Sequence, residues 1–207
     1  AVPVSMIHQF YFVYTSGFLG EYQAQAEGAV KVINSVFGVG GGGLMTIGQM
    51  AEVLVLFLIP FVAGKWSRKT LLAIGLAAYA LRMFLFSQVE WINSLTGMGE
   101  IGILIAGIAL HGLCFGCFIF VAFMVVDEEC SVDVKASAQN LFNLVIIGIG
   151  IVVGSYVAGQ IGDWATTKDG MDWSALFTIP MYAAVVCLGL LLAFYPARRP
   201  ISTAKMK

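Results

Sequence analysis

The sequence predicts an all-α membrane protein with six transmembrane helices, and two observations carry this prediction. First, 59% of the 207 residues are hydrophobic and only 11% are charged, whereas soluble domains carry about 25% charged residues. Second, the apolar residues gather into runs of about the 20 residues that a helix needs to cross a bilayer core. Membrane strands are about 10 residues long and alternate in polarity, whereas these runs are apolar on most faces.

Six such runs follow one another, and we expect them to form one transmembrane bundle over residues 1–207. The chain starts with Ala and lacks the basic segment and small-residue cleavage site of a signal peptide, so we interpret it as a fragment of a longer protein. The predicted spans are 1–19, 41–64, 70–88, 101–126, 136–161 and 174–195.

Basic residues are distributed unevenly between the two sides of these spans, which predicts an orientation. Lys and Arg concentrate in cytoplasmic loops, so the richer side predicts a multi-pass plasma-membrane protein with its C-terminus in the cytoplasm. The net charge of −1 gives no reason to expect a nucleic-acid partner. The richer side holds Lys65, Arg68, Lys69, Lys135, Arg198, Arg199, Lys205 and Lys207, and the other side holds Lys31 and Lys168.

The sequence predicts neither a cofactor nor a metal site. Cys114 and Cys117 form a CxxC motif, but no second pair or histidine cluster accompanies it. His8 and His111 are the only histidines, and no HExxH or GxSxG motif occurs, which disfavours an intramembrane enzyme. A purely structural membrane subunit remains an alternative.

Small residues in the fifth span predict a close helix contact. Gly150 and Gly154 form a GxxxG motif that Ala158 extends by another turn. Such stripes let helix backbones approach one another in a membrane.

Polar side chains within the spans mark the candidate site. Glu52, Gln49 and Thr46 lie three residues apart on one face of the second span, which we expect to face the bundle interior. A charge at mid-bilayer costs about 2.5–3.5 kcal/mol on insertion scales, so Glu52 needs a partner or a purpose. Two interpretations stay open: a structural ion pair with Arg82 at similar depth, or a solute- or proton-binding carboxylate in a wet cavity.

Two further groups of residues have both a structural and a functional interpretation. His111 shares a helical face with Phe115 and Phe118, as expected either for packing or for contact with a ligand. The acidic run 127–129 precedes Lys135 and forms either a cytoplasmic gate or a solvated charge cluster.

Several segments resemble a known family. The chain is similar to the C-terminal half of bacterial nucleoside:proton symporters of the major facilitator superfamily. The segments that carry the resemblance are Gln9 with Tyr14, Gln49-Met50-Ala51-Glu52, Leu81-Arg82, Gly112 with Phe115, Lys135-Ala136-Ser137-Ala138-Gln139 and Asp172-Trp173.

The resemblance implies six of the twelve helices of a two-bundle carrier that works by alternating access, with the N-terminal six-helix half missing. It further implies proton-coupled uptake of a nucleoside-like solute across the bacterial inner membrane, with proton coupling at Glu52 and His111. The solute-binding residues that it implies are Gln9, Gln49, Glu52, His111 and Phe115.

Two positions depart from the family pattern. Phe12, which we include among the solute contacts, stands where family members carry Asn, and Gly116 stands where they carry Asp. The second departure leaves Glu52 as the only carboxylate deep in the spans. A sugar or another small solute therefore remains an alternative cargo.

Overall fold

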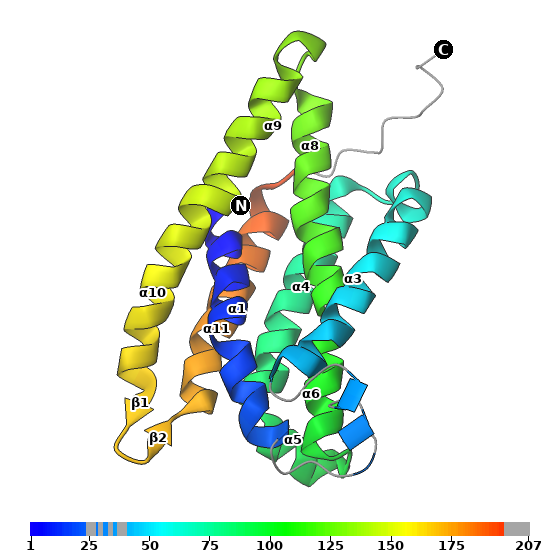
Figure 1. Ribbon diagram of the computed structural model, residues 1–207. Helices are drawn as coiled ribbons and strands as arrows, with labels where there is room; N and C mark the ends of the chain where they lie inside the picture. The colour runs from blue at the N-terminus through cyan, green and yellow to red at the C-terminus, as the bar shows by residue number, and fades with distance from the viewer. Residues whose placement is uncertain (24–27, 29–30, 33–34, 37–40, 197–207) are drawn as a thin grey trace.

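The structure, a computed structural model, describes residues 1–23, 28, 31–32, 35–36 and 41–196. Long helices run side by side along most of the molecule (Figure 1). The elements are α1 (Val2–Gln23), α3 (Gly41–Ala63), α4 (Arg68–Ser87), α5 (Val89–Thr96), α6 (Glu100–Ala109), α7 (His111–Leu113), η1 (Cys114–Phe120), α8 (Val121–Glu129), η2 (Val132–Val134), α9 (Lys135–Asn143), η3 (Leu144–Ile149), α10 (Gly150–Ala165), β1 (Thr166–Thr167), β2 (Gly170–Met171) and α11 (Trp173–Phe194).

Five helical segments are long and apolar enough to cross a membrane, which confirms the predicted class. They are Gly43–Ala63, Arg68–Ser87, Glu100–Glu129, Val132–Ala165 and Trp173–Phe194. Each matches a predicted span to within a few residues.

The first predicted span corresponds to α1, whose 22 residues would extend about 33 Å at 1.5 Å per residue. This helix is less apolar than the others because it carries Ser5, His8, Gln9, Thr15 and Ser16. It packs against α3, α10 and α11, with its apolar side chains in the common core. Its length and packing suit a sixth span, which stays a prediction.

The segments between spans contain more structure than the sequence predicts. The predicted loop over 89–100 forms the short helix α5, which ends at Gly97 in a left-handed conformation with φ 64°. The predicted loop over 162–173 forms a small antiparallel hairpin in which Thr166 pairs with Met171. Most of the predicted loop over 20–40 lies outside the described residues.

The fourth and fifth spans are not regular α-helices throughout. The fourth is interrupted at Leu110 and continues through α7 into a π-helix, η1, while the fifth contains a second π-helix, η3, between α9 and α10. A π-helical segment changes the direction of the side chains that follow it and often lies at a functional site. His111 is the first residue after the interruption.

The small-residue stripe of the fifth span packs on α1, as predicted. A β-carbon at Gly154 would lie 2.9 Å from the Cα of Met6, so only glycine permits this approach. The Tyr14 hydroxyl donates to the carbonyl of Ala158 at 2.8 Å. The close contact therefore joins the first and fifth spans along two helical turns.

The charged ends of the bundle are grouped as predicted. The turn between α3 and α4 and the turn between α8 and α9 lie at one end of the bundle, and the β1–β2 hairpin lies at the other (Figure 1). Lys65, Arg68, Lys69 and Lys135 therefore share an end, opposite Lys168. The cytoplasmic location of the lysine-rich end stays a prediction.

Candidate functional site

Two glycines let α3 and α7 cross closely at mid-bundle. A β-carbon on Gly112 would overlap the backbone carbonyl of Ala51. A β-carbon on Gly48 would lie 3.2 Å from the Cβ of His111. Because both positions lack a side chain, the backbones approach until His111 on α7 lies beside Glu52 on α3.

His111 links Glu52 to Arg82. Its Nε2 lies 3.3 Å from a carboxylate oxygen of Glu52, and its Nδ1 lies 3.0 Å from Nη1 of Arg82. The side chain of His111 is 4% exposed and that of Glu52 is 25% exposed. The structure thus corrects the predicted direct ion pair between Glu52 and Arg82: the close crossing at Gly112 places the imidazole between them.

Arg82 is completely buried among aromatic rings. Its guanidinium carbon lies 3.9 Å from the ring centroid of Tyr11 and 5.1 Å from that of Tyr79. The faces of aromatic rings attract cations, most strongly where water is excluded. The Nε and Nη2 atoms of Arg82 have no hydrogen-bond partner within the described part of the chain. Arg82 contacts His111, and His111 contacts the carboxylate of Glu52, so Glu52 is the anion of this group of side chains.

His8 also belongs to this group, and the sequence analysis did not select it. Its ring stacks on that of His111 with centroids 5.4 Å apart and an interplanar angle of 24°. Its Nδ1 forms a hydrogen bond of 2.6 Å with the buried hydroxyl of Tyr79. The available signal was an ionisable ring inside a predicted span, because such residues generally face the bundle interior.

Phe12 and Phe115, both predicted solute contacts, lie next to the two histidines. The Phe12 ring meets His111 edge to face at 5.7 Å and is 45% exposed. The ring centroid of Phe115 lies 6.1 Å from that of His8. Exposed aromatic surface therefore borders the polar group.

The two predicted glutamines lie outside this group. Gln9 donates through Nε2 to Ser155 on α10 at 3.0 Å, so its amide is turned toward the fifth span. Gln49 is exposed on α3, almost one turn before Glu52. Sequence spacing placed Gln49 and Glu52 on one face, but only Glu52 reaches His111.

Gly116, the position of the missing family carboxylate, lies against α3. A β-carbon there would lie 2.6 Å from Cγ1 of Val55. Phe118 packs equally closely, since a β-carbon on Gly75 would lie 2.7 Å from its Cβ. The structure therefore assigns Phe118 to packing and leaves no room for a larger side chain at Gly116 without rearrangement.

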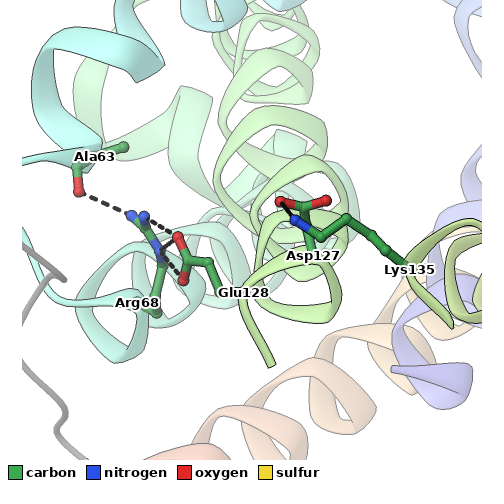
Figure 2. A network of polar contacts seen from close by, with 5 residues as sticks. All are labelled: Ala63, Arg68, Asp127, Glu128 and Lys135. Carbon is green, nitrogen blue, oxygen red and sulfur yellow. Dashed lines mark hydrogen bonds and ion pairs between the residues drawn. The ribbon is translucent and has the colours of Figure 1, made fainter. Parts of the chain in front are cut away.

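A second set of charged contacts lies at the lysine-rich end of the bundle (Figure 2). Arg68 binds Glu128 through Nη2 at 2.5 Å and through Nε at 3.0 Å, and it also donates to the carbonyl of Ala63. Lys135 pairs with Asp127 at 2.9 Å. The acidic run at the end of α8 is thus joined to the α3–α4 turn and to α9.

The described residues contain no group of three or more His, Cys, Asp and Glu side chains arranged to hold a metal ion. What they do contain is a bundle of membrane-length helices with a cation, two imidazoles and a partly exposed carboxylate at its centre. Ionisable residues placed this way generally mark substrate or ion pathways, so this combination is typical of membrane transport proteins.

The comparisons narrow this class to a family. The family model described as nucleoside H+ symporter matches residues 1–199. This chain belongs to that family.

Several members resemble the chain over part of their length. It is 27% identical to the nucleoside permease NupG of Escherichia coli strain K12 over 152 residues, which cover 73% of this chain and 35% of the permease. It is 29% identical to the xanthosine permease of the same organism over 136 residues, covering 66% of this chain and 31% of that protein. The crystal structure of the nucleoside transporter NupG matches with a TM-score of 0.76 and 25% identity, over 95% of this chain and 47% of that structure. The chain thus spans about half the length of the solved structure and about a third of the length of each of the two permeases.

Proposed function

We propose that the complete protein takes up a nucleoside or nucleoside-like solute together with protons, by alternating access. The family membership and the polar group at mid-bundle support this proposal. The chain covers 47% of the solved relative, and its motifs resemble those of the C-terminal half of the family, so it would form the C-terminal bundle and close the solute pathway against an N-terminal six-helix half. The protein would lie in the bacterial inner membrane with its C-terminus in the cytoplasm.

The observation that carries the proposal is the position of the Glu52 carboxylate. It contacts buried His111 on one side and is 25% exposed on the other, so it lies at the edge of the polar group where a proton and a solute can reach it. Protonation removes the negative charge linked to Arg82, which changes the free energy of any state in which this group is closed to water. A ligand shifts an equilibrium only when it binds the two states differently, and proton binding at Glu52 provides such a difference.

The solute would bind against the exposed ring of Phe12 and the partly buried ring of Phe115. A nucleobase stacks on such rings, while the carboxylate of Glu52 and the amide of Gln49 can bond base edges or ribose hydroxyls. His111 would contribute through its bond to Glu52. Gln9 would contribute through its carbonyl oxygen, because its amide nitrogen already donates to Ser155.

The exposed ring of Phe12 supports a second candidate for the transported solute. The resembled family carries Asn at this position, and the ring replaces that hydrogen-bonding group with an apolar face. Sugars also stack on aromatic rings through their apolar faces, so a sugar or another small solute is the alternative.

Uptake of labelled nucleosides and sugars by the complete protein, with and without a proton gradient, tests the proposal. We expect gradient-dependent accumulation of a nucleoside by the wild type. Glu52→Gln should lose accumulation but keep exchange of labelled for unlabelled solute, because Gln resembles a carboxyl group that is permanently protonated. Glu128→Gln, at the lysine-rich end, is the matched control and should accumulate normally. Accumulation against a gradient by Glu52→Gln would overturn the assigned role of Glu52.

A further inference from the structure

The hydrogen bonds of His111 determine which of its nitrogens carries the proton. A guanidinium only donates hydrogen bonds, so Nδ1 of His111 must accept from Nη1 of Arg82 at 3.0 Å. The imidazole proton is therefore on Nε2, which faces the Glu52 carboxylate at 3.3 Å. The hydrogen bond from Arg82 thus determines which tautomer the neutral ring of His111 adopts.

The surroundings of His111 oppose a second proton on its ring. The residues facing it are Arg82 from α4, Glu52 from α3, and His8 and Tyr11 from α1. A proton on Nδ1 would point at the guanidinium and set two positive charges about 3 Å apart inside the bundle, where the low dielectric makes repulsion strong. Glu52 is the only anion among these neighbours, and it faces the opposite nitrogen.

Arg82 is held firmly enough to impose this arrangement. It is completely buried, and the ring of Tyr11 lies 3.9 Å from its guanidinium carbon. Tyr11 in turn stacks on His111 at 5.1 Å. The rings of Tyr11 and Tyr79 both lie against the guanidinium, so it cannot turn away from Nδ1 of His111 without displacing them.

We propose that Arg82 is a positioning residue for proton coupling. It fixes His111 as a neutral ring whose Nε2–H faces Glu52 at 3.3 Å, so that His111 helps to orient the carboxylate and Glu52 alone takes up the coupled proton. This inference rests on the proposed symport function and deepens it. It assigns the coupling step to one titrating group rather than to the pair Glu52 and His111.

The pH profile of uptake by the complete protein tests the inference. His111→Gln carries an amide that can donate near the former Nε2 but cannot titrate, so its profile should have the same number of titration steps as the wild type, even where the midpoint and the rate change. His111→Asn, whose shorter amide does not reach Glu52, should lose accumulation. A wild-type step that disappears in His111→Gln would overturn the inference, because His111 would then carry a proton itself.

Variants of Arg82 test the cause of the arrangement. Arg82→Met removes the donor at Nδ1, so His111 should become free to titrate and add a second step in the range where histidines titrate, about pH 5 to 8. This second titration step should vanish in the double variant Arg82→Met/His111→Gln. Arg82→Lys, whose ammonium group also only donates hydrogen bonds, should keep the wild-type profile. An Arg82→Met protein that inserts normally and keeps one step would contradict the role of Arg82.

A spectroscopic measurement decides the question if Arg82→Met does not insert. Nitrogen-15 spectra of the complete protein labelled at histidine report the tautomer, and His111 is assigned by its loss in His111→Gln. We expect a protonated Nε2 and an unprotonated Nδ1 across the pH range of uptake. A doubly protonated ring in that range would overturn the inference. Absence of nucleoside uptake by the wild type, or accumulation by Glu52→Gln, would instead refute the proposed function.

Discussion

The middle and the lysine-rich end of the bundle solve the same electrostatic problem differently. At the end, Arg68 meets Glu128 directly through two nitrogens (Figure 2). Both side chains keep contact with solvent, with exposures of 16% and 28%. In the middle, fully buried Arg82 reaches Glu52 only through His111 and leaves two nitrogens without a hydrogen-bond partner among the described residues.

The difference shows that hydrogen-bond geometry alone does not identify the functional charges. Solvated ion pairs typically contribute only about 0–1 kcal/mol. A buried, incompletely satisfied cation destabilises the fold unless other groups compensate it, so its presence indicates a purpose beyond stability. The less complete network is therefore the stronger candidate for function, and each of the following experiments tests one of the two regions.

The largest effect is expected where the helices of the central group cross. Gly112→Ala would place a β-carbon on the carbonyl of Ala51 and push α7 away from α3, which should cost about 1–3 kcal/mol. Thermal unfolding in detergent and uptake assays should both register this loss. Gly189→Ala in α11 is the matched control, because a β-carbon there meets nothing within 4 Å in this bundle. Equal behaviour of the two variants would show that the close crossing does not hold the central group together.

The aromatic surface beside the central group should contribute to solute affinity. Phe115→Ala removes a ring next to His8, and base stacking on an aromatic side chain is worth about 1–3 kcal/mol, so nucleoside affinity should fall at least several-fold. Binding measured by displacement of a labelled nucleoside checks this. Phe194→Ala, at the end of α11, removes an 80% exposed ring and should leave affinity unchanged. Unchanged affinity in Phe115→Ala would assign that ring to packing.

Compensation of Arg82 by aromatic rings should be measurable as stability. Tyr11→Leu removes the ring that lies 3.9 Å from the guanidinium carbon, and a cation–π contact is worth about 0.5–2 kcal/mol. Tyr11→Phe retains the ring and should behave nearly as the wild type in thermal unfolding. If Leu and Phe were equivalent at this position, the ring would not contribute to holding the buried cation.

The smallest effect is expected at the lysine-rich end. Arg68→Gln should lower the free energy of unfolding by about 1 kcal/mol or less and leave uptake nearly unchanged, because the contact with Glu128 is partly solvated. The loss should shrink further as salt is raised. If uptake by Arg68→Gln fell as far as uptake by Glu52→Gln, the acidic run at the end of α8 would act as a gate.

The sequence predicted the spans well because the bilayer limits them physically. Backbone groups within lipid must be hydrogen-bonded inside their own helix, and the thickness of the apolar core sets the helix length. The predicted span 70–88 and the observed α4, Arg68–Ser87, therefore differ by only two residues at most. The close helix contact at Gly150 and Gly154 was also predictable from the sequence, because small side chains let helix backbones approach closely in a membrane.

The candidate site could be predicted only in part. Glu52 and His111 were singled out because polar residues inside apolar runs stand out along the chain, whereas Phe12 and Phe115 were proposed as solute contacts from the family resemblance. Their partners were not, since a depth argument placed Arg82 beside Glu52 without showing that His111 lies between them. The turn of Gln9 toward Ser155 likewise depends on how α1 is rotated in the bundle.

The chain by itself determined which segments form helices long and apolar enough to cross a membrane and which side chains are too polar to face lipid, because hydropathy and helix length act locally. Only the tertiary structure decided which of those side chains meet. The close approach at Gly48 and Gly112 depends on how α3 and α7 are rotated about their axes, and it brings His111 beside Glu52. Because neighbours on different helices depend on that rotation, the order Arg82, His111, Glu52 emerges only when the helices are packed together.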